Sequence, residues 1–113
     1  MASAAPAGAG GLTLLPYFDG ERTPNLPSAT GLLAGLRSDV SREQLARAAV
    51  EGVVCGMLDA LDALMAHAPV TSVVLTGGGA RSAAVRQVFA DLCSVPVSLS
   101  TADEAVATGA CVQ

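Results

Sequence analysis

Lysine and tryptophan are absent from this sequence of 113 residues, and aromatic residues of any kind make up only 3% of it. All six basic residues are arginine, and the formal net charge at pH 7 is −4. A chain of this charge lacks the basic surface with which proteins bind nucleic acid or an anionic membrane. Charged residues amount to 14% against 51% hydrophobic residues, which excludes a disordered, solvating tail. We therefore expect a folded protein with no nucleic acid and no membrane as its partner.

Cysteine and histidine are too few and too scattered for a disulfide framework or a metal site. The three cysteines, Cys55, Cys93 and Cys111, form no CxxC pair, and His67 is the only histidine. The apolar neighbours of the cysteines favour buried free thiols in a reducing cytoplasm. No apolar run approaches the ~20 residues of a membrane span, and the first residues lack the positive region of a signal peptide. These features predict a cytoplasmic protein without a metal site in this chain.

The length of the chain allows one small domain, or one lobe of a larger protein. Because its apolar residues are mostly alanine, valine and leucine, its core buries little area per residue. At ~25 cal/mol per Å² of buried apolar surface, such a core is thin against the entropy cost of folding. We therefore expect the chain to depend on a partner surface or on further polypeptide.

The first third of the chain alternates short apolar runs with turn-forming residues. Residues 1–11 consist largely of alanine, glycine and proline and are expected to be irregular. Apolar runs at 12–15 and 32–36 are candidates for short strands. Between them, residues 16–31 contain three prolines together with glycine and asparagine, which predicts a loop of structured turns.

A long helix is predicted to begin after Ser41. The Ser41 hydroxyl and Gln44, at the third helical position, have the spacing of a capping box. Apolar residues then recur with a period near 3.6 residues through about His67. Gly52 and Gly56 lie one turn apart among them, which predicts the close approach of another backbone. The expected buried stripe comprises Leu45, Ala48, Ala49, Gly52, Val53, Gly56, Met57, Ala60, Leu61, Leu64 and Met65.

The last third of the chain has the pattern of a parallel α/β unit. Residues 70–75 predict a strand buried on both faces, and residues 76–80 (TGGGA) break it. Ser82 opens a second helix, 95–99 form a second strand, and the acidic residues 103–104 begin a third helix. The order predicts an α/β fold with a right-handed crossover between two parallel strands. The expected buried residues of the second helix are Val85, Val88, Phe89 and Leu92.

The glycine turn, residues 76–80, is the strongest local candidate for a ligand site. Three consecutive glycines allow positive φ and let a ligand approach the backbone closely. The helix that follows Ser82 presents free N–H groups and a partial positive charge, which suit a phosphate or nucleotide. The alternative is a tight strand–helix turn without a ligand. The sequence has neither the Walker A nor the GxGxxG spacing, and Arg81 is interpreted as a solvated charge.

Residues 20–24 (GERTP), here called the GERTP loop, are a second candidate. Glu21 and Arg22 are adjacent charges held between prolines, and such a loop could order a cleft or contact a substrate. The alternative is a structural loop with a local ion pair between these two residues. Glu51 lies in an apolar stretch, and we hypothesise that it bonds to the GERTP loop. Three further residues are interpreted as solvated or helix-end charges: Asp59, Asp62 and His67.

Several of these segments together resemble the FGGY family of carbohydrate kinases. Residues 31–36 (GLLAGL) and 44–51 (QLARAAVE) match the second signature of that family. Residues 16–25 (PYFDGERTPN) and the TGGGARS segment at 76–82 resemble its xylulokinase branch. Residues 104–110 (EAVATGA) are similar to a late EAxALGA helix of the family. The resemblance runs from about Gly8 to Gln113, nearly the whole chain.

The resemblance implies part of the C-terminal lobe of a two-lobed kinase with the actin/Hsp70-like (ribonuclease H-like) ATPase fold, so that residues 1–113 form a partial C-terminal domain. It implies transfer of the γ-phosphoryl group of ATP, with Mg²⁺, to a sugar hydroxyl, that of D-xylulose in the xylulokinase branch, giving xylulose 5-phosphate. By the same resemblance, Gly78, Gly79 and Ala80 line the adenosine and phosphate site, and Ser82 and Ala83 border the adenine.

The departures from the family pattern bear on activity. Family members are several times longer, and no residue of this chain matches the catalytic aspartate, which is expected in the N-terminal part together with the sugar site. Thr108 also replaces the usual leucine of the late helix. The isolated chain is therefore expected to be inactive. The alternative is a non-catalytic orphan lobe, and a homodimer of the full-length enzyme stays open.

Overall fold

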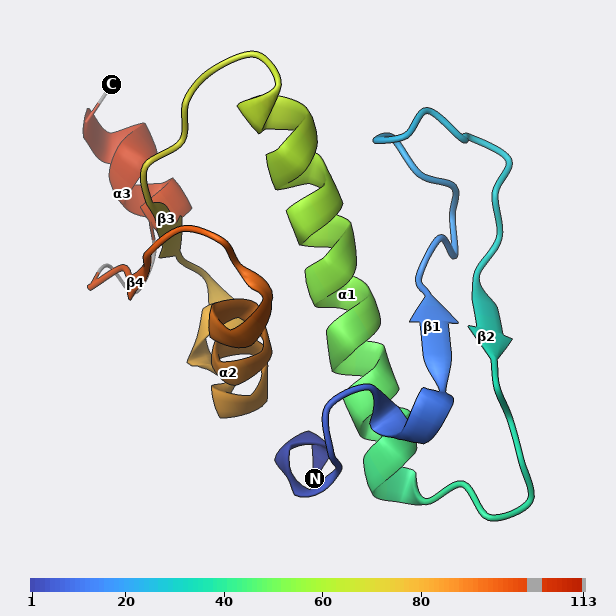
Figure 1. Cartoon of the computed structure of the whole chain (residues 1–113). Helices are drawn as coiled ribbons and strands as arrows, with labels where there is room; N and C mark the ends of the chain where they lie inside the picture. Colours follow the sequence, from blue (N-terminus) through green and yellow to red (C-terminus); the bar gives the residue numbers. More distant parts are fainter. Residues whose placement is uncertain (102–104, 113) are drawn as a thin grey trace. The chain divides into compact units, whose positions relative to one another are not determined.

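The computed structural model of the chain describes residues 1–101 and 105–112 (Figure 1). The chain divides into two compact units, Met1–Ala68 and Pro69–Gln113. The first unit opens with two 3₁₀ turns, Ala2–Ala4 and Ala9–Gly11, where the composition predicts irregular chain. These turns are short, and the second contains Gly10 in a left-handed conformation, which the alanine- and glycine-rich sequence readily adopts.

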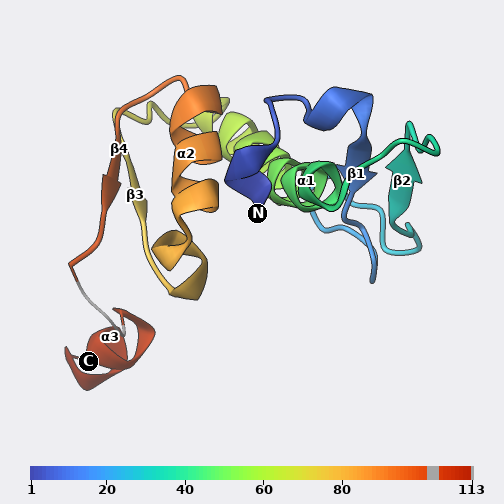
Figure 2. The same ribbon diagram turned by 90° about the horizontal axis from the view of Figure 1, so that it is seen from below.

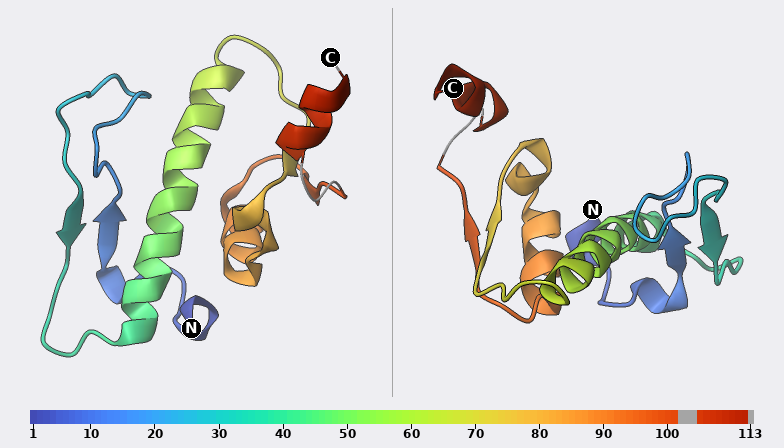
Figure 3. Two further views of the ribbon diagram at one scale, coloured as in Figure 1. Left: turned by 180° about the vertical axis from the view of Figure 1, so that it is seen from behind. Right: turned by 90° about the horizontal axis from the view of Figure 1, so that it is seen from above.

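The first unit contains a two-stranded antiparallel sheet beside a long helix, as two views show (Figure 1 and Figure 3). Strand β1, Thr13–Leu15, pairs with β2, Leu32–Ala34, and Leu14 lies opposite Leu33. Both strands were predicted from their apolar runs. A small core lies between β1, its preceding turn and the helix; it consists of Ala9, Leu12 and Ala48, with Leu33 and Val40 packed against it. Its small side chains agree with the thin core that the composition predicts.

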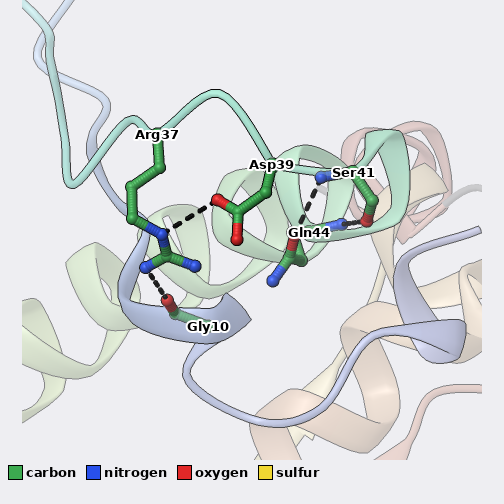
Figure 4. Close-up of polar contacts among 5 residues, drawn as sticks. All are labelled: Gly10, Arg37, Asp39, Ser41 and Gln44. Carbon is green, nitrogen blue, oxygen red and sulfur yellow. Dashed lines mark hydrogen bonds and ion pairs between the residues drawn. The ribbon is translucent and has the colours of Figure 1, made fainter.

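Helix α1, Arg42–Met65, begins with the capping box that the sequence predicts (Figure 4). The Gln44 backbone N–H donates to the Ser41 hydroxyl at 3.2 Å, and the Ser41 N–H donates to the Gln44 side-chain oxygen at 2.8 Å. Just before the helix, Arg37 donates to the Gly10 carbonyl at 3.1 Å and to Asp39 at 3.0 Å. The start of α1 is therefore tied both to its own first turn and to the N-terminal segment.

The buried side of α1 differs in part from the predicted stripe. Ala48 and Gly52 are buried as predicted, but Val53 is 45% exposed and Met57 is 50% exposed. Val54, outside the predicted stripe, is fully buried instead. The helical period is correct, but the sequence does not say which sides of the helix are covered by neighbouring residues. Leu45 and Leu64, also in the predicted stripe, are exposed as well.

The two glycines of α1 have different surroundings. A Cβ atom on Gly52 would collide with the Leu14 carbonyl oxygen of β1, so the predicted close approach of a backbone is confirmed there. A Cβ atom on Gly56 would meet nothing within 4 Å, so the same prediction is wrong for Gly56. Only Gly52 is therefore required for the packing of β1 on α1.

The second unit has the predicted strand–turn–helix–strand order. Strand β3, Val73–Leu75, is parallel to β4, Val97–Leu99, with Val74 opposite Ser98. Helix α2, Ala83–Leu92, connects them and lies along one face of the pair (Figure 2 and Figure 3). The prediction that the first strand is buried on both faces is wrong for this chain, because Val74 is 58% exposed.

Helix α2 and the C-terminal helix complete the second unit. Val88 and Phe89 of α2 are buried as predicted, whereas Leu92 is half exposed. Helix α3, Ala105–Val112, follows β4 in the chain. Asp103 and Glu104, predicted to begin this helix, lie outside the described residues.

The three cysteines are free thiols, but the prediction that all are buried is wrong. Cys55 and Cys111 are exposed, and Cys93 is partly buried. Apolar neighbours in sequence therefore do not ensure burial. None of the helices in the described part of the chain is long and apolar enough to cross a membrane.

Candidate functional site

The glycine turn connects the carboxyl end of β3 to α2. Gly77 has a φ of 85°, a conformation that favours glycine, and it is followed by a 3₁₀ turn at Gly78–Arg81. Two backbone hydrogen bonds close this turn, from the Ala80 N–H to the Gly77 carbonyl at 3.2 Å and from the Ser82 N–H to the Gly79 carbonyl at 3.1 Å. The Ser82 hydroxyl then accepts from the Val85 N–H at 3.4 Å and caps α2. The predicted break and cap are confirmed, with the 3₁₀ turn inserted between them.

A hollow of about 150 Å³ lies at the carboxyl ends of β3 and β4. It is lined by residues 75–77, by Ala80 and Arg81, by Arg86 of α2, and by residues 99–100. In open parallel sheets, ligands bind at this end of the strands, where loops and helix N-termini converge. We call it the strand-end hollow.

The five predicted site residues have different relations to the strand-end hollow. Ala80 lines it directly. Gly78 and Gly79 belong to the same turn but not to the lining, and a Cβ atom on either would meet nothing within 4 Å. Ser82 and Ala83 follow in the chain and are exposed. The structure therefore leaves open space beside the two glycines.

Arg86 belongs to this site although its sequence context did not mark it. Its Nη1 atom donates to the Ala80 carbonyl at 3.0 Å and to the Arg81 carbonyl at 2.9 Å. The side chain of a residue in the first turn of a helix leans toward the N-terminus, which brings the guanidinium to the preceding turn. An arginine four residues after an N-cap serine was the only available signal. Arg81 itself is exposed and also lines the strand-end hollow.

The GERTP loop forms a narrow turn at the far end of the segment that joins β1 and β2. Glu21 and Leu26 exchange two backbone hydrogen bonds, at 2.9 and 2.8 Å. The Glu21 carboxylate accepts from the backbone N–H of Arg22 at 2.6 Å and of Thr23 at 3.2 Å. The predicted ion pair between Glu21 and Arg22 side chains is therefore wrong, because the carboxylate binds backbone N–H groups instead.

These contacts also lower the pKa of the Glu21 carboxyl group. The backbone hydrogen bonds from Thr23 and Arg22, in that order, hold the pKa of Glu21 below its ordinary value, and the nearby Arg22 charge acts in the same direction. Asp19, Asn25 and Pro27 surround an open hollow together with the loop. The loop is thus an ordered, polar turn that carries charge of both signs on an exposed surface.

Glu51 binds a different segment from the one predicted. Its carboxylate accepts from the Gly8 N–H at 3.0 Å and from Arg47 Nε at 2.6 Å. The hypothesis that Glu51 bonds to the GERTP loop is therefore wrong. The side chains of Arg47 and Glu51 are 9% and 18% exposed, so this ion pair is largely withdrawn from solvent and joins α1 to the N-terminal segment.

The remaining polar candidates do not form a site. Asp59, Asp62 and His67 are exposed, as expected for solvated charges. Within residues 1–101 and 105–112, no group of three or more histidine, cysteine, aspartate or glutamate side chains is arranged to hold a metal ion.

The sequence is similar to that of known carbohydrate kinases. The model of the C-terminal domain of the FGGY family of carbohydrate kinases matches residues 1–113. The chain is 49% identical to a xylulose kinase of Streptomyces coelicolor over 104 residues. This match covers 90% of this chain and 22% of that enzyme. Over 108 residues the chain is 36% identical to a gluconokinase of Bacillus subtilis, covering 93% of this chain and 21% of that enzyme.

A solved structure shares the fold. The xylulose kinase from Bifidobacterium adolescentis aligns with a TM-score of 0.84 and 45% identity, over 96% of this chain and 22% of that one. This similarity confirms the predicted fold class, part of the C-terminal lobe of an actin/Hsp70-like ATPase fold. The chain spans about a fifth of the length of the relatives that it matches.

Proposed function

This chain belongs to the FGGY family of carbohydrate kinases, and we propose that it supplies adenine-nucleotide contacts to an ATP-dependent kinase that phosphorylates D-xylulose to xylulose 5-phosphate. The observation that carries the proposal is the glycine turn, which lies open beside a hollow at the carboxyl ends of two parallel strands. The names of the relatives, xylulose kinase at up to 49% identity among those compared, support the substrate.

In this proposal the nucleotide is contacted mainly by backbone atoms of the turn and not by reactive side chains. Gly78, Gly79 and Ala80 line the adenosine and phosphate site, and Ser82 and Ala83 border the adenine. The glycines at 77–79, which have no Cβ atom, let a ligand approach the chain closely. The N-terminus of α2, with its free N–H groups and partial positive charge, favours an anionic ligand nearby. The assignment needs no acidic or basic catalyst within this chain.

The remainder of the kinase supplies the rest of the reaction. Phosphoryl transfer requires both substrates and Mg²⁺ to be held in line, and this depends on groups from both sides of the site. We assign the pentulose site, the Mg²⁺-bound phosphates and the catalytic aspartate to polypeptide other than these residues. Residues 1–113 are then one partial C-terminal domain, inactive as a kinase when isolated. A cytoplasmic location is part of the same proposal.

The test is the kinase activity of the native polypeptide that carries these residues, with a steric variant of the turn. Because a Cβ atom at Gly79 meets no protein atom within 4 Å, Gly79→Val adds bulk to the open space beside the turn. We expect D-xylulose phosphorylation by the natural protein and a KM for ATP at least about tenfold higher in Gly79→Val. Gly56→Ala is the control, since it also adds atoms to open space and lies far along the chain in α1. An unchanged KM for ATP in Gly79→Val would contradict the nucleotide assignment.

Gluconate is a second candidate substrate, favoured by the 36% identity to a gluconokinase. The same assay with D-gluconate in place of D-xylulose distinguishes the two sugars. Phosphorylation of neither sugar, with no ATP binding, would favour the alternative of a non-catalytic orphan lobe.

A further inference from the structure

We propose that Arg86 is a positioning residue for nucleotide binding, because its guanidinium holds the glycine turn in the conformation that receives the nucleotide. The inference rests on the proposed function of that turn. It concerns a residue that donates to the turn from outside it and is not among the residues proposed to contact the nucleotide.

Among the described residues, the side-chain hydrogen bonds of Arg86 both go to the turn. Its Nη1 atom bridges two consecutive carbonyls, those of Ala80 and Arg81, at 3.0 and 2.9 Å. Both carbonyls lie at the end of the 3₁₀ turn, where backbone acceptors have no helical partners. Hydrogen bonds from a charged donor are roughly twice as strong as neutral ones. The guanidinium therefore fixes the orientation of two peptide groups at once.

The turn needs such a restraint because of its composition. Residues 77–79 are all glycine, which loses more conformational freedom on ordering than any other residue. Besides the bonds internal to the 3₁₀ turn, its backbone has two hydrogen bonds among the described residues, those accepted by the Gly77 and Gly79 carbonyls. Without Arg86, the turn would sample other conformations, and a ligand would have to order it at the moment of binding.

Arg86 also lies at the strand-end hollow itself. Arg86 and Ala80 both line the strand-end hollow, so the hydrogen bond between them is part of the wall of that hollow. Arg86 is part-buried on α2, a regular helix whose first turn is capped by Ser82. A rigid helix thus positions the donor, and the donor positions the flexible turn. Loss of Arg86 should therefore weaken the binding of the nucleotide more than that of the sugar.

The experiment compares Arg86→Met and Arg86→Lys in the native polypeptide. Methionine keeps the apolar stem and removes the donors, whereas lysine keeps the charge on a compact, shorter group. We expect the KM for ATP to rise about tenfold in Arg86→Met and about threefold in Arg86→Lys, with kcat and the KM for the sugar within about twofold. Arg42→Met, at an exposed position in the first turn of α1, is the control and should leave all three constants unchanged.

A second readout separates this inference from the proposed function. Amide hydrogen exchange of residues 77–82 without nucleotide should be faster in Arg86→Met than in the natural protein. If both substrates' KM values rise equally, or only the melting temperature falls, Arg86 is merely structural and the inference is overturned. If the natural protein binds ATP and Arg86→Met binds it equally well, the inference fails while the proposed function stands. If the natural protein binds no ATP, both fail.

Discussion

Arg47 and Glu51 form an ion pair one turn apart on α1, with Nε and Oε1 2.6 Å apart and both side chains largely out of solvent. The same Glu51 oxygen also accepts from the Gly8 N–H, 43 residues away in the chain. This carboxylate therefore joins the N-terminal segment to the long helix. Removing one partner of this pair should destabilise the fold, because it would leave a largely buried charge without a counter-ion.

We predict that Glu51→Gln lowers the free energy of unfolding by about 3 kcal/mol, because it leaves the Arg47 charge buried without a counter-ion. Urea denaturation of the polypeptide that carries this chain measures the change. Asp62→Asn, an exposed position on the same helix, is the control and should change stability by less than about 0.5 kcal/mol. Equal stability of Glu51→Gln and the natural protein would show that the pair has no net structural role.

The two glycines of α1 give opposite predictions for the same substitution. Gly52→Ala should destabilise the protein despite a better helix propensity, because the new methyl group collides with the backbone of Leu14. Gly56→Ala should be neutral or stabilise by up to ~1 kcal/mol, since it gains propensity in open space. Thermal melting of both variants checks this. Stabilisation by Gly52→Ala would contradict the close approach of β1.

The GERTP loop should lose order in acid. The pKa of Glu21 is lower in the folded protein than its ordinary value of 4.5, owing to the backbone hydrogen bonds. Because the pKa is lower in the folded protein, the ionised carboxylate stabilises the loop fully above pH 4.5. This stabilisation is lost as the pH falls through the pKa of the folded protein. The amide signals of Arg22 and Thr23 should therefore shift together with a midpoint below pH 4.5 in a nuclear magnetic resonance titration. In Glu21→Gln the same signals should not titrate in that range.

Cys55 should react slowly with thiol reagents although it is exposed. Partial desolvation, then the charges of Asp59 and Glu51, raise the pKa of this thiol, so little thiolate is present at neutral pH. We expect Asp59→Asn to lower this pKa and to increase the rate of alkylation of Cys55 at pH 8, followed by mass spectrometry. An unchanged rate in that variant would show that the Asp59 charge does not act on the thiol. Alkylation of Cys111 in the same sample is the internal control.

Local signals in the sequence predicted the elements well. The cap of α1 at Ser41 and Gln44, the strands at 13–15 and 32–34, and the break at the glycine turn all follow from residues within a few positions of each other. The close approach at Gly52 was also predicted correctly, but the same reasoning was wrong for Gly56, where a Cβ atom would meet nothing within 4 Å.

Side-chain partners distant in the chain could not be predicted in the same way. The Gly8 N–H that binds Glu51 has no sequence signal, since any backbone N–H can serve. In the sequence, Arg86 looks like any arginine on a helix. Only the folded structure shows that its side chain reaches the carbonyls of the preceding turn. The exposure of Val53 and Met57 depends on which neighbours cover the helix, and a periodic pattern does not contain this information. The candidate site was therefore located by its glycines, while the residue that restrains them was missed.

The most direct test of the central claim is amide hydrogen exchange of the native polypeptide, measured with and without MgADP. If the glycine turn contacts the nucleotide, exchange of residues 76–83 should slow when MgADP binds, while α1, Arg42–Met65, serves as the reference in the same experiment. Unchanged exchange at residues 76–83 under saturating nucleotide would contradict the assignment of this turn to the nucleotide site.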